Sequence, residues 1–491
     1  MSDILHSGVG CVDITPHLNF PMGLWRAAQH LRAEGVHMPL HATCLVLGTL
    51  TLRIAIVNLD LMLLSVNQAR AIQEAVSVVV GIDIENVWVF VTHNHAGPAT
   101  LETYTGDGEV EVNAYIRSLP VFCADAARKA VAALIPVRVA SGKGTCHIGV
   151  NRDLKLTDGT FIIAPNSAGF SDSEVGVIKI DDLDGNLIAI IANYSCHPTI
   201  AGHENKLLSP DYPGYTRKVV EDITGAKCIF LQGAAGNVGP QEGFTSDLRV
   251  VERLGAILGC EIAKVALQTM TLKTQFVLDR VVPSMSAQLG VMKSVEAVQA
   301  SQEVSIGNRK VNLPTGNPYG HSYTGIEDEI RKLSAALAEM ESIDSSAAEI
   351  ANKGIAINRL LWMQARGGRL LEKGFCSVDI KVLCIGDIAL VGTWGEMFSE
   401  TGFEIKEGSQ FGHTLVAAYM GGDAAYLPLR ADYTNPARLE VMNTPIAPGG
   451  AELLSQAISD LLRELKIQYI KNTQSTLINN DFVLVKLPEN T

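Results

Sequence analysis

Short apolar runs alternate with segments of helical periodicity over most of this chain. The runs are rich in Val, Ile and Leu and are bounded by Gly, Pro, Asn or Asp, a pattern typical of buried strands. They predict strands at 43–47, 54–59, 87–91, 137–142, 175–180, 187–193 and 227–231. Residues 65–80 and 116–134 predict helices between them. The alternation predicts an α/β or mixed α+β fold with a multi-stranded mixed sheet.

The pattern changes in the C-terminal part of the chain. The strand pattern stops at residue 285, and helical periodicity over 326–340 and 347–371 predicts a helical insertion with a polar loop at 307–323. Strands return at 378–385, 388–393 and 414–420, and a helix follows at 451–465. We therefore predict one domain over residues 1–466, with the helical insertion at about 285–373, and a peripheral tail over 467–491. The insertion is a candidate cover for a site, an oligomer contact or plain scaffold.

Composition narrows the classes of partner. The 491 residues are 47% hydrophobic and carry a net charge of −13 without a basic patch, which argues against nucleic-acid or anionic-membrane partners. No apolar stretch is long enough for membrane insertion. Nine cysteines are scattered singly, and the N-terminus lacks the features of a signal peptide. We expect a cytoplasmic protein with a small-molecule substrate and a possible homo-oligomeric state.

Two histidines follow the predicted strand at 87–91. His93 and His95 stand between that strand and the loop signal Gly97-Pro98, so they lie where α/β folds build ligand sites. Residues two apart on an extended segment point to the same side, so both rings can address one metal ion or substrate. The alternative is a pair of surface loop histidines.

The same placement recurs twice. His197 follows the predicted strand at 187–193 and precedes Pro198, and Glu396 follows the strand at 388–393. Each alone also fits an ordinary structural or exposed turn residue. Two histidines and one carboxylate match the ligands of a catalytic zinc ion with an open position for water, and manganese or iron accept the same set.

Other polar residues have two interpretations each. The small-residue loop 232–240 is either a ligand-binding loop or a tight turn, and its sequence excludes a nucleotide-binding motif. Asp60 lies in an apolar run, where it can orient a metal-bound histidine or cap a turn. Arg152 and Asp211 fall in predicted loops, compatible with substrate contact or with exposure. Tyr426 is a candidate ligand or proton donor, or an ordinary half-buried aromatic residue.

Taken in order, several motifs resemble the neutral/alkaline (non-lysosomal) ceramidase family, in its shorter bacterial branch. They are Gly-Val-Gly-Cys-Val-Asp-Ile-Thr-Pro near the N-terminus, Thr-His93-Asn-His95-Ala-Gly-Pro, Gly-Val-Asn-Arg152, Asn-Tyr-Ser-Cys-His197-Pro-Thr, Ser-Pro-Asp-Tyr-Pro-Gly-Tyr, Gln-Gly-Ala-Ala-Gly-Asn-Val-Gly-Pro, Gly-Glu396 and Tyr426-Leu-Pro. Each is weak alone, whereas the ordered set, which covers roughly residues 7–466, is fairly specific.

The resemblance implies a ceramidase-like catalytic domain and a set of site residues. By this resemblance, His93, His197, Glu396 and Tyr426 hold one zinc ion per chain, and His95 and Arg152 assist catalysis. The implied reaction is hydrolysis of a carbon–nitrogen amide bond by metal-activated water.

One departure from the family pattern bears on the substrate. The family carries Asp-Val-Ser-Pro, with a catalytic serine, where this chain has Asn237-Val238-Gly239-Pro240. We therefore expect a small soluble amide or lactam substrate in place of a lipid. A metal-dependent esterase, an N-acyl-lipid amidase and a non-catalytic metal-binding relative remain alternatives. A phosphohydrolase with two metals would need further ligands, for which Asp60 and Asp211 are the spare candidates. A metallo-β-lactamase is excluded because His95 is followed by Ala-Gly-Pro.

Overall fold

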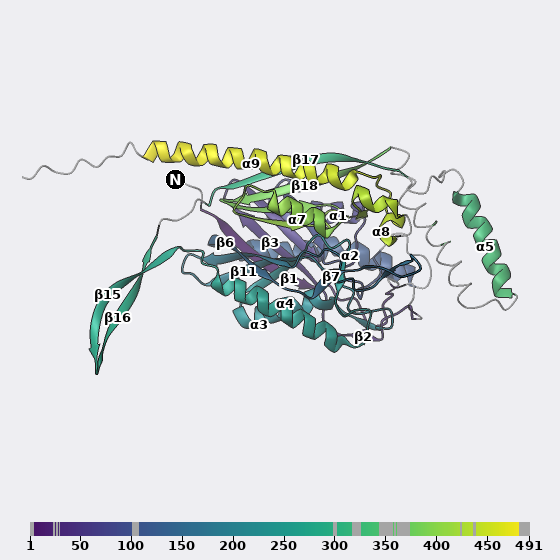
Figure 1. Cartoon of the computed structure of the whole chain (residues 1–491), viewed down its shortest axis with the longest axis horizontal. Coiled ribbons are helices and arrows are strands. Elements are labelled where there is room, and N and C mark those ends of the chain that lie inside the picture. The colour runs from purple at the N-terminus through teal and green to yellow at the C-terminus, as the bar shows by residue number, and fades with distance from the viewer. Residues whose placement is uncertain are drawn as a thin grey trace, which may run out of the picture.

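The structure is a computed structural model that describes residues 4–22, 25, 28, 30–100, 108–297, 302–316, 326–342, 357, 360, 374–422, 425–435 and 438–480. Two β-sheets stack face to face, and helices cover both outer faces, which makes four layers (Figure 1). This architecture confirms the predicted α/β class with a mixed sheet.

The larger sheet has eight strands in the order β13-β11-β10-β6-β1-β3-β4-β5. These strands are β1 (His6–Asp13), β3 (His41–Gly48), β4 (Arg53–Leu59), β5 (Val87–Val91), β6 (Ile135–Thr145), β10 (Glu174–Asp182), β11 (Leu187–Tyr194) and β13 (Lys227–Gln232). Neighbours are antiparallel except β4–β5 and β11–β13, which are parallel.

The smaller sheet has four strands in the order β17-β18-β19-β21. They are β17 (Val304–Pro314), β18 (Phe375–Ile385), β19 (Ile388–Thr393) and β21 (His413–Ala417), and β19 is parallel to β21. The inner faces of the two sheets share one apolar core, in which Trp88, Ile191 and Leu390 are buried. Burial from both sides explains why these strands read as nearly continuous apolar runs in the sequence.

Helices bury the outer faces of both sheets. Helices α1 (Val66–Val80) and α2 (Glu109–Ala132) pack on the β1–β5 half of the larger sheet, and α3 (Asp211–Thr224) and α4 (Leu248–Gln268) pack on the other half. Helices α7 (Ser399–Glu407) and α9 (Gly450–Asn480) cover the smaller sheet. Ser65 and Gln68 form a capping box that fixes the start of α1.

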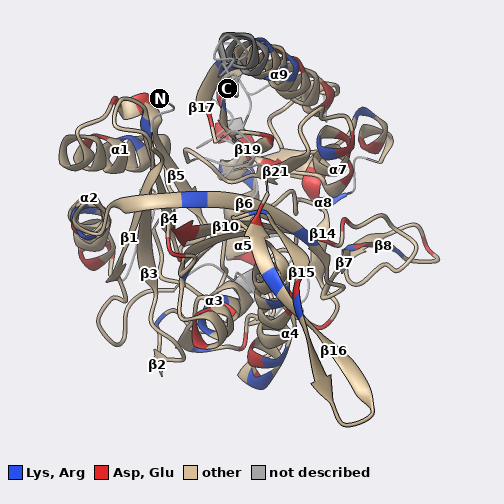
Figure 2. Ribbon diagram, turned by 90° about the vertical axis from the view of Figure 1, so that its left-hand side faces the viewer, with Lys and Arg blue, Asp and Glu red and all other residues tan. Residues whose placement is uncertain are grey.

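Shorter elements complete the described chain. They are β2 (Gly35–Val36), β7 (Gly149–Asn151), β8 (Asp153–Lys155), β9 (Phe161–Ile163), β12 (Leu207–Leu208), β14 (Val238–Pro240), β20 (Glu396–Met397), β22 (Tyr426–Leu427), α5 (Ile326–Ser342) and α8 (Leu439–Met442), with 3-10 turns at Ile84–Asn86 and Arg430–Thr434. A hairpin of β15 (Thr274–Ser284) and β16 (Ala287–Glu296) extends away from the body (Figure 2).

One supersecondary unit occurs three times. An antiparallel hairpin is followed by a crossover helix and then by a strand parallel to the second hairpin strand. The three units are β3-β4-α1-β5, β10-β11-α3-β13 and β18-β19-α7-β21. A parallel pair requires such a crossover, and its two strands end at the same sheet edge.

The predicted strands up to residue 231 and those at 378–385 and 388–393 are confirmed. The prediction that strands stop at 285 was wrong, because β16 and β17 lie inside the segment 285–373, and β17 replaces the start of the loop predicted at 307–323. The tail predicted at 467–491 is helical as far as residue 480, as part of α9.

Helix α5 confirms the helix predicted at 326–340, whereas most of the helix predicted at 347–371 lies outside the described residues. The division into domain, insertion and tail stays a prediction. Among the described helices, none combines the length and the apolar character needed to cross a membrane.

Candidate active site

The three repeated units bring their strand ends to one place. His93 follows β5, His197 follows β11 and Glu396 follows β19, each with a side chain that is almost completely buried. His93 adopts a left-handed backbone conformation with φ of 62°, which is uncommon for a residue with a side chain and points to a functional constraint. The Pro198 carbonyl accepts a hydrogen bond from the amide of His95 at 3.3 Å, so the loops after β5 and β11 are joined directly.

One carboxylate oxygen meets both histidine rings. Glu396 Oε2 lies 3.4 Å from His93 Nε2 and 3.2 Å from His197 Nε2. The two ring centroids are 4.9 Å apart. The possible ligand atoms of His93, His95 and His197 all lie within 4.8 Å of one another. These distances place the three predicted ligands around one point.

The Nδ1 atoms of His93 and His197, which lie on the other side of each ring from Glu396, both meet a backbone carbonyl. His93 Nδ1 lies 2.8 Å from the Met62 carbonyl oxygen, and His197 Nδ1 lies 2.7 Å from that of Ala235. Because a carbonyl only accepts, each Nδ1 carries a proton, and each Nε2 faces Glu396. Burial, together with the charge of Arg152, lowers the pKa of His197 to about 3, so this ring is neutral at pH 7.

Two imidazole nitrogens and one carboxylate oxygen therefore converge on one point. His197 Nε2 and Glu396 Oε2 are buried and have no hydrogen-bond partner among the described residues. A divalent cation satisfies such a set, and histidines that donate Nδ1–H to a carbonyl are the usual arrangement at metal sites. The residues present fit a metal ion.

His95 lies beside this set but has a different environment. Its ring centroid is 5.1 Å from that of His93 and 5.2 Å from that of Trp25, and its buried Nε2 has no partner among the described residues. Burial and the neighbouring histidines hold the pKa of His95 well below its ordinary value. The ring is neutral and is available to exchange a proton or a hydrogen bond with a ligand.

Arg152 lies beside Tyr426 and carries a buried positive charge. Its Nη2 donates to Tyr426 Oη at 3.1 Å, to the Gly236 carbonyl at 2.8 Å and to Glu440 Oε1 at 3.0 Å. Burial alone would lower the pKa of Arg152, but Tyr426, Glu440 and Glu396 raise it above the ordinary arginine value. The guanidinium is therefore a permanent and oriented cation.

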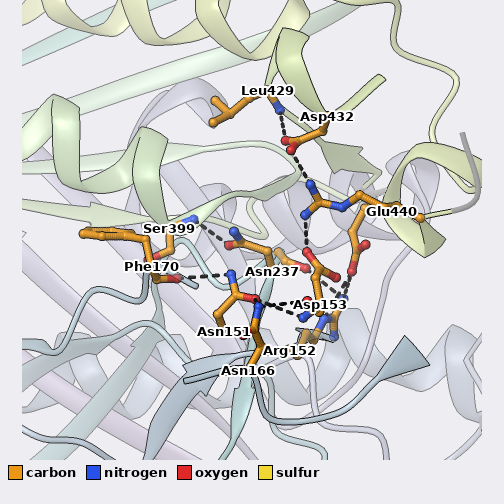
Figure 3. A network of polar contacts seen from close by, with 12 residues as sticks. Asn151, Arg152, Asp153, Asn166, Phe170, Asn237, Ser399, Leu429, Asp432 and Glu440 are labelled. Carbon is orange, nitrogen blue, oxygen red and sulfur yellow. Dashed lines mark hydrogen bonds and ion pairs between the residues drawn. The ribbon is translucent and has the colours of Figure 1, made fainter. Parts of the chain in front are cut away.

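A wider polar network holds Arg152 in place (Figure 3). The Arg152 amide donates to the Asn237 carbonyl at 3.0 Å, and the Asn237 side chain accepts from the Ser399 amide at 2.9 Å. Asp153, the next residue along the chain, forms an ion pair with Arg438. The network ties the loop after β13 to the start of α7, next to Glu396.

Tyr426 and Tyr419 complete the surroundings of the histidines. Strand β22 is parallel to β20 and places Tyr426 beside Glu396. Sequence reasoning missed Tyr419, whose ring centroid is 4.4 Å from that of His93 and whose buried hydroxyl has no partner among the described residues. Tyr419 also has a positive φ of 60°. It follows β21 as His93 follows β5, so the same strand-end signal could have identified it.

The small-residue loop after β13 is a tight turn that packs on the site. The amides of Gly233, Gly236 and Val238 donate to the carbonyls of Tyr194, Met397 and Ala235, so these three amides are used within the fold. A Cβ atom at Gly236 would lie 2.4 Å from the Glu396 carbonyl oxygen. Glycine is thus required where the loop meets β20, as the turn interpretation of this loop expects.

Two carboxylates considered as site residues serve the fold. Asp60 forms a buried two-point ion pair with Arg217, at 2.8 and 2.5 Å, and does not orient His93. Asp211 begins α3, is buried and accepts a hydrogen bond from the Ala201 amide at 2.9 Å. Both are committed to these contacts, so neither is a spare ligand for a second metal.

The fold and the site together define an α/β protein with a buried cluster of two histidines and a glutamate that has the character of a metal centre. No family model matches the chain. In sequence, it is 26% identical over 251 residues to the neutral ceramidase of Pseudomonas aeruginosa and 28% identical over 138 residues to neutral ceramidase A of Dictyostelium discoideum.

Solved structures extend this similarity to the whole fold. The crystal structure of neutral ceramidase from Pseudomonas aeruginosa covers 95% of this chain with a TM-score of 0.65 and 20% identity, and a ceramidase complexed with C2 covers 95% with a TM-score of 0.65 and 19% identity. The resemblance to the neutral ceramidase family that the motifs predicted is thereby confirmed in sequence and in fold.

The similarity covers only part of the length of each relative. The two sequence matches involve 48% and 27% of this chain, and 36% and 19% of the respective relatives. The solved neutral ceramidase is matched over 75% of its length. The structure brings all six predicted site residues together, and their roles stay predictions.

Proposed function

We propose that this chain is a metal-dependent hydrolase that cleaves the carbon–nitrogen bond of a small amide. The observation that carries the proposal is the meeting of His93 Nε2, His197 Nε2 and Glu396 Oε2, within 3.4 Å of the shared oxygen, with both Nδ1 protons committed to carbonyl groups. The similarity to neutral ceramidases supports amide hydrolysis as the reaction. His93, His197, Glu396 and Tyr426 are the residues that would hold the ion, which we propose to be zinc.

Bound at these residues, a zinc ion supplies hydroxide at neutral pH and polarises the carbonyl of the substrate. The chain itself supplies the remaining parts. Arg152 is a buried cation whose position is fixed by Glu440, so it stabilises the negative charge that develops on the carbonyl oxygen. His95 is neutral and its Nε2 has no partner among the described residues, so it can accept the proton that the attacking water loses and pass it to the nitrogen of the departing amine.

The site has no serine hydroxyl at position 239, because that residue is glycine. A glycine has no hydroxyl group, so the loop after β13 offers no serine at that position, and water remains the nucleophile. The substrate proposal follows from the same difference. We expect a small amide to be preferred over an N-acyl lipid.

Metal analysis of the purified protein tests the proposal. We expect about one metal ion per chain, lost in His93→Ala and in His197→Ala. His413→Ala is the matched control, because His413 is also buried but lies outside the site. Loading with zinc, manganese or iron, followed by release of amine from short N-acyl amides and from N-acylsphingosines, then assigns the ion and the substrate. Folded protein that binds no metal in any form would refute the proposal.

A further inference from the structure

The hairpin β15–β16 is a part of the molecule that the proposed function does not use, and we propose that it is an arm that binds a second copy of this chain. Within the described part of the chain its two strands pair only with each other, and it extends away from the four-layered body (Figures 1 and 2). A two-stranded ribbon without packing on another element is only marginally stable in water. The ribbon therefore needs a surface to cover it.

Large apolar side chains are exposed along the whole arm. Their exposed fractions are Phe276 74%, Leu278 56%, Val281 51%, Leu289 49% and Met292 51%. Isolated exposed apolar residues are ordinary on protein surfaces, but a continuous set of this size marks an interaction site.

Both faces of the ribbon are apolar. Alternation along the strands, with the register Leu278↔Met292 and Val282↔Leu289, places Leu278 and Met292 on one face and Val282 and Leu289 on the other. Ten residues of strand span roughly 33 Å, and two strands with their side chains are roughly 10 Å wide, so each face offers roughly 300 Å². One covered face falls short of the ~800 Å² per partner of a standard interface, whereas both faces together approach it.

The sequence of β15 is complementary to itself. When two copies of β15 lie antiparallel about the pair Asp279–Arg280, apolar residues meet apolar residues in each half. The opposed residues are Leu278 and Val281, Val277 and Val282, and Phe276 and Pro283. Acid meets base at the centre, and the β-bulge between Leu278 and Arg280 lies there as well. A twofold axis through this point generates an isologous contact, which is the commonest form of a homodimer.

The neutral charge of the arm also favours a second copy of this chain as its partner. The whole chain has a net charge of −13, so two bodies repel each other, whereas residues 274–296 contain two acidic and two basic residues and have no net charge. A lipid surface would cover the tip, where Met285 is fully exposed between two serines, and leave the base in water, whereas the exposed apolar residues of this arm continue to its base. The two β15 strands thus pair edge to edge, which joins the apolar faces of the two arms into a wider surface on each side, and these surfaces are left for the bodies of the two copies.

Light scattering on the full chain tests the proposal. We expect a mass twice the 52.6 kDa of one chain at micromolar concentration. The triple variant Phe276→Ser, Leu278→Ser, Met292→Ser should raise the dissociation constant at least about 100-fold, because apolar anchors carry most of the energy of an interface. Val78→Ser, which removes a side chain 83% exposed on α1, is the matched control and should remain a dimer. No described residue of the arm belongs to the core, so all variants should fold with the circular dichroism spectrum of the wild type.

Cross-linking tests the alignment of the two arms. In a Cys260→Ser background, which removes an exposed thiol, a mixture of Leu278→Cys and Val281→Cys chains should be joined by a short thiol cross-linker. A mixture of Val281→Cys and Val78→Cys should not.

A wild-type monomer, or a dimer that survives the triple substitution, would overturn the proposal. So would a monomer that floats with phosphatidylcholine vesicles and loses this property in the triple variant, since that result assigns the arm to a lipid surface. None of these results depends on metal binding, so this proposal and the proposed function fail independently.

Discussion

A methyl group added at Gly236 tests the close approach between the loop after β13 and Glu396. The new Cβ would lie 2.4 Å from the Glu396 carbonyl oxygen and 3.0 Å from that of Met397. The first contact is about 1 Å shorter than the ~3.5 Å at which a carbon atom makes a favourable contact. Neither side yields easily, because the Gly236 amide donates to the Met397 carbonyl and the Glu396 amide donates to that of Ala425, both at 2.8 Å.

We expect Gly236→Ala to lower the free energy of unfolding by about 1–3 kcal/mol, the usual cost of overpacking. The strain falls on Glu396, so metal affinity should fall with it, and a displacement of about 1 Å at a catalytic group reduces activity roughly 100-fold. Gly239→Ala is the matched control. Its Cβ would lie 3.5 and 3.6 Å from carbon atoms of Arg152, which is ordinary contact.

Urea unfolding and metal content of both variants give the answer. Both substitutions restrict the unfolded chain to the same degree, so the difference between them isolates the clash. Equal stability and equal metal content in the two variants would refute the reasoning. A loss of stability in Gly236→Ala with full metal content would confirm the clash but remove Glu396 from the ligand set.

Three further predictions concern other parts of the molecule. Asp60→Ala leaves the guanidinium of Arg217 buried without its partner. Urea unfolding should therefore show that the free energy of unfolding falls by about 3–5 kcal/mol, with unchanged metal content per folded chain. A fall below about 1 kcal/mol would contradict this. Burial, with a smaller contribution from Lys143, lowers the pKa of His413 to about 4. Below about pH 6.5 the unfolded ring binds a proton and the folded ring does not, so the wild-type protein loses stability between pH 7 and pH 5. The His413→Asn variant lacks this group, so its loss of unfolding free energy over the same range should be about 2 kcal/mol smaller. An equal pH dependence in both proteins would show that His413 is not the source. Gly239→Ser should leave the unfolding free energy within about 0.5 kcal/mol of the wild type. It should also raise the turnover of N-acylsphingosines relative to that of small amides. An unchanged ratio of these two turnover rates would show that Gly239 does not set the substrate.

The sequence was most informative where strands are buried on both faces. Runs such as Val87–Val91 have few alternatives to a central strand, and a histidine directly after such a run lies at the edge of the sheet. The same logic located His197 and Glu396. It missed Tyr419 because the predicted strand 414–420 ran past Ala417, where β21 ends.

Features that depend on close approach or on exposure could not be read in the same way. The requirement for glycine at Gly236 arises from the backbone of Glu396, which is 160 positions away along the chain. The hairpin β15–β16 has apolar residues on both exposed faces and therefore lacks the alternation that marks a half-buried strand. The partner of Arg152, Glu440, lies in the short helix α8, where a carboxylate gives no sign of its burial.

The threefold recurrence of hairpin, crossover helix and parallel strand has a consequence for folding. Each unit contributes one member of the trio His93, His197 and Glu396, although the units share no repeated sequence. No unit holds more than one of these proposed ligands, so the proposed metal site requires all three units to have assembled. An ion that binds only the assembled state stabilises it by mass action. Metal affinity is therefore a direct gauge of how completely the three units have docked, and a partly assembled chain should release its ion before it loses its secondary structure.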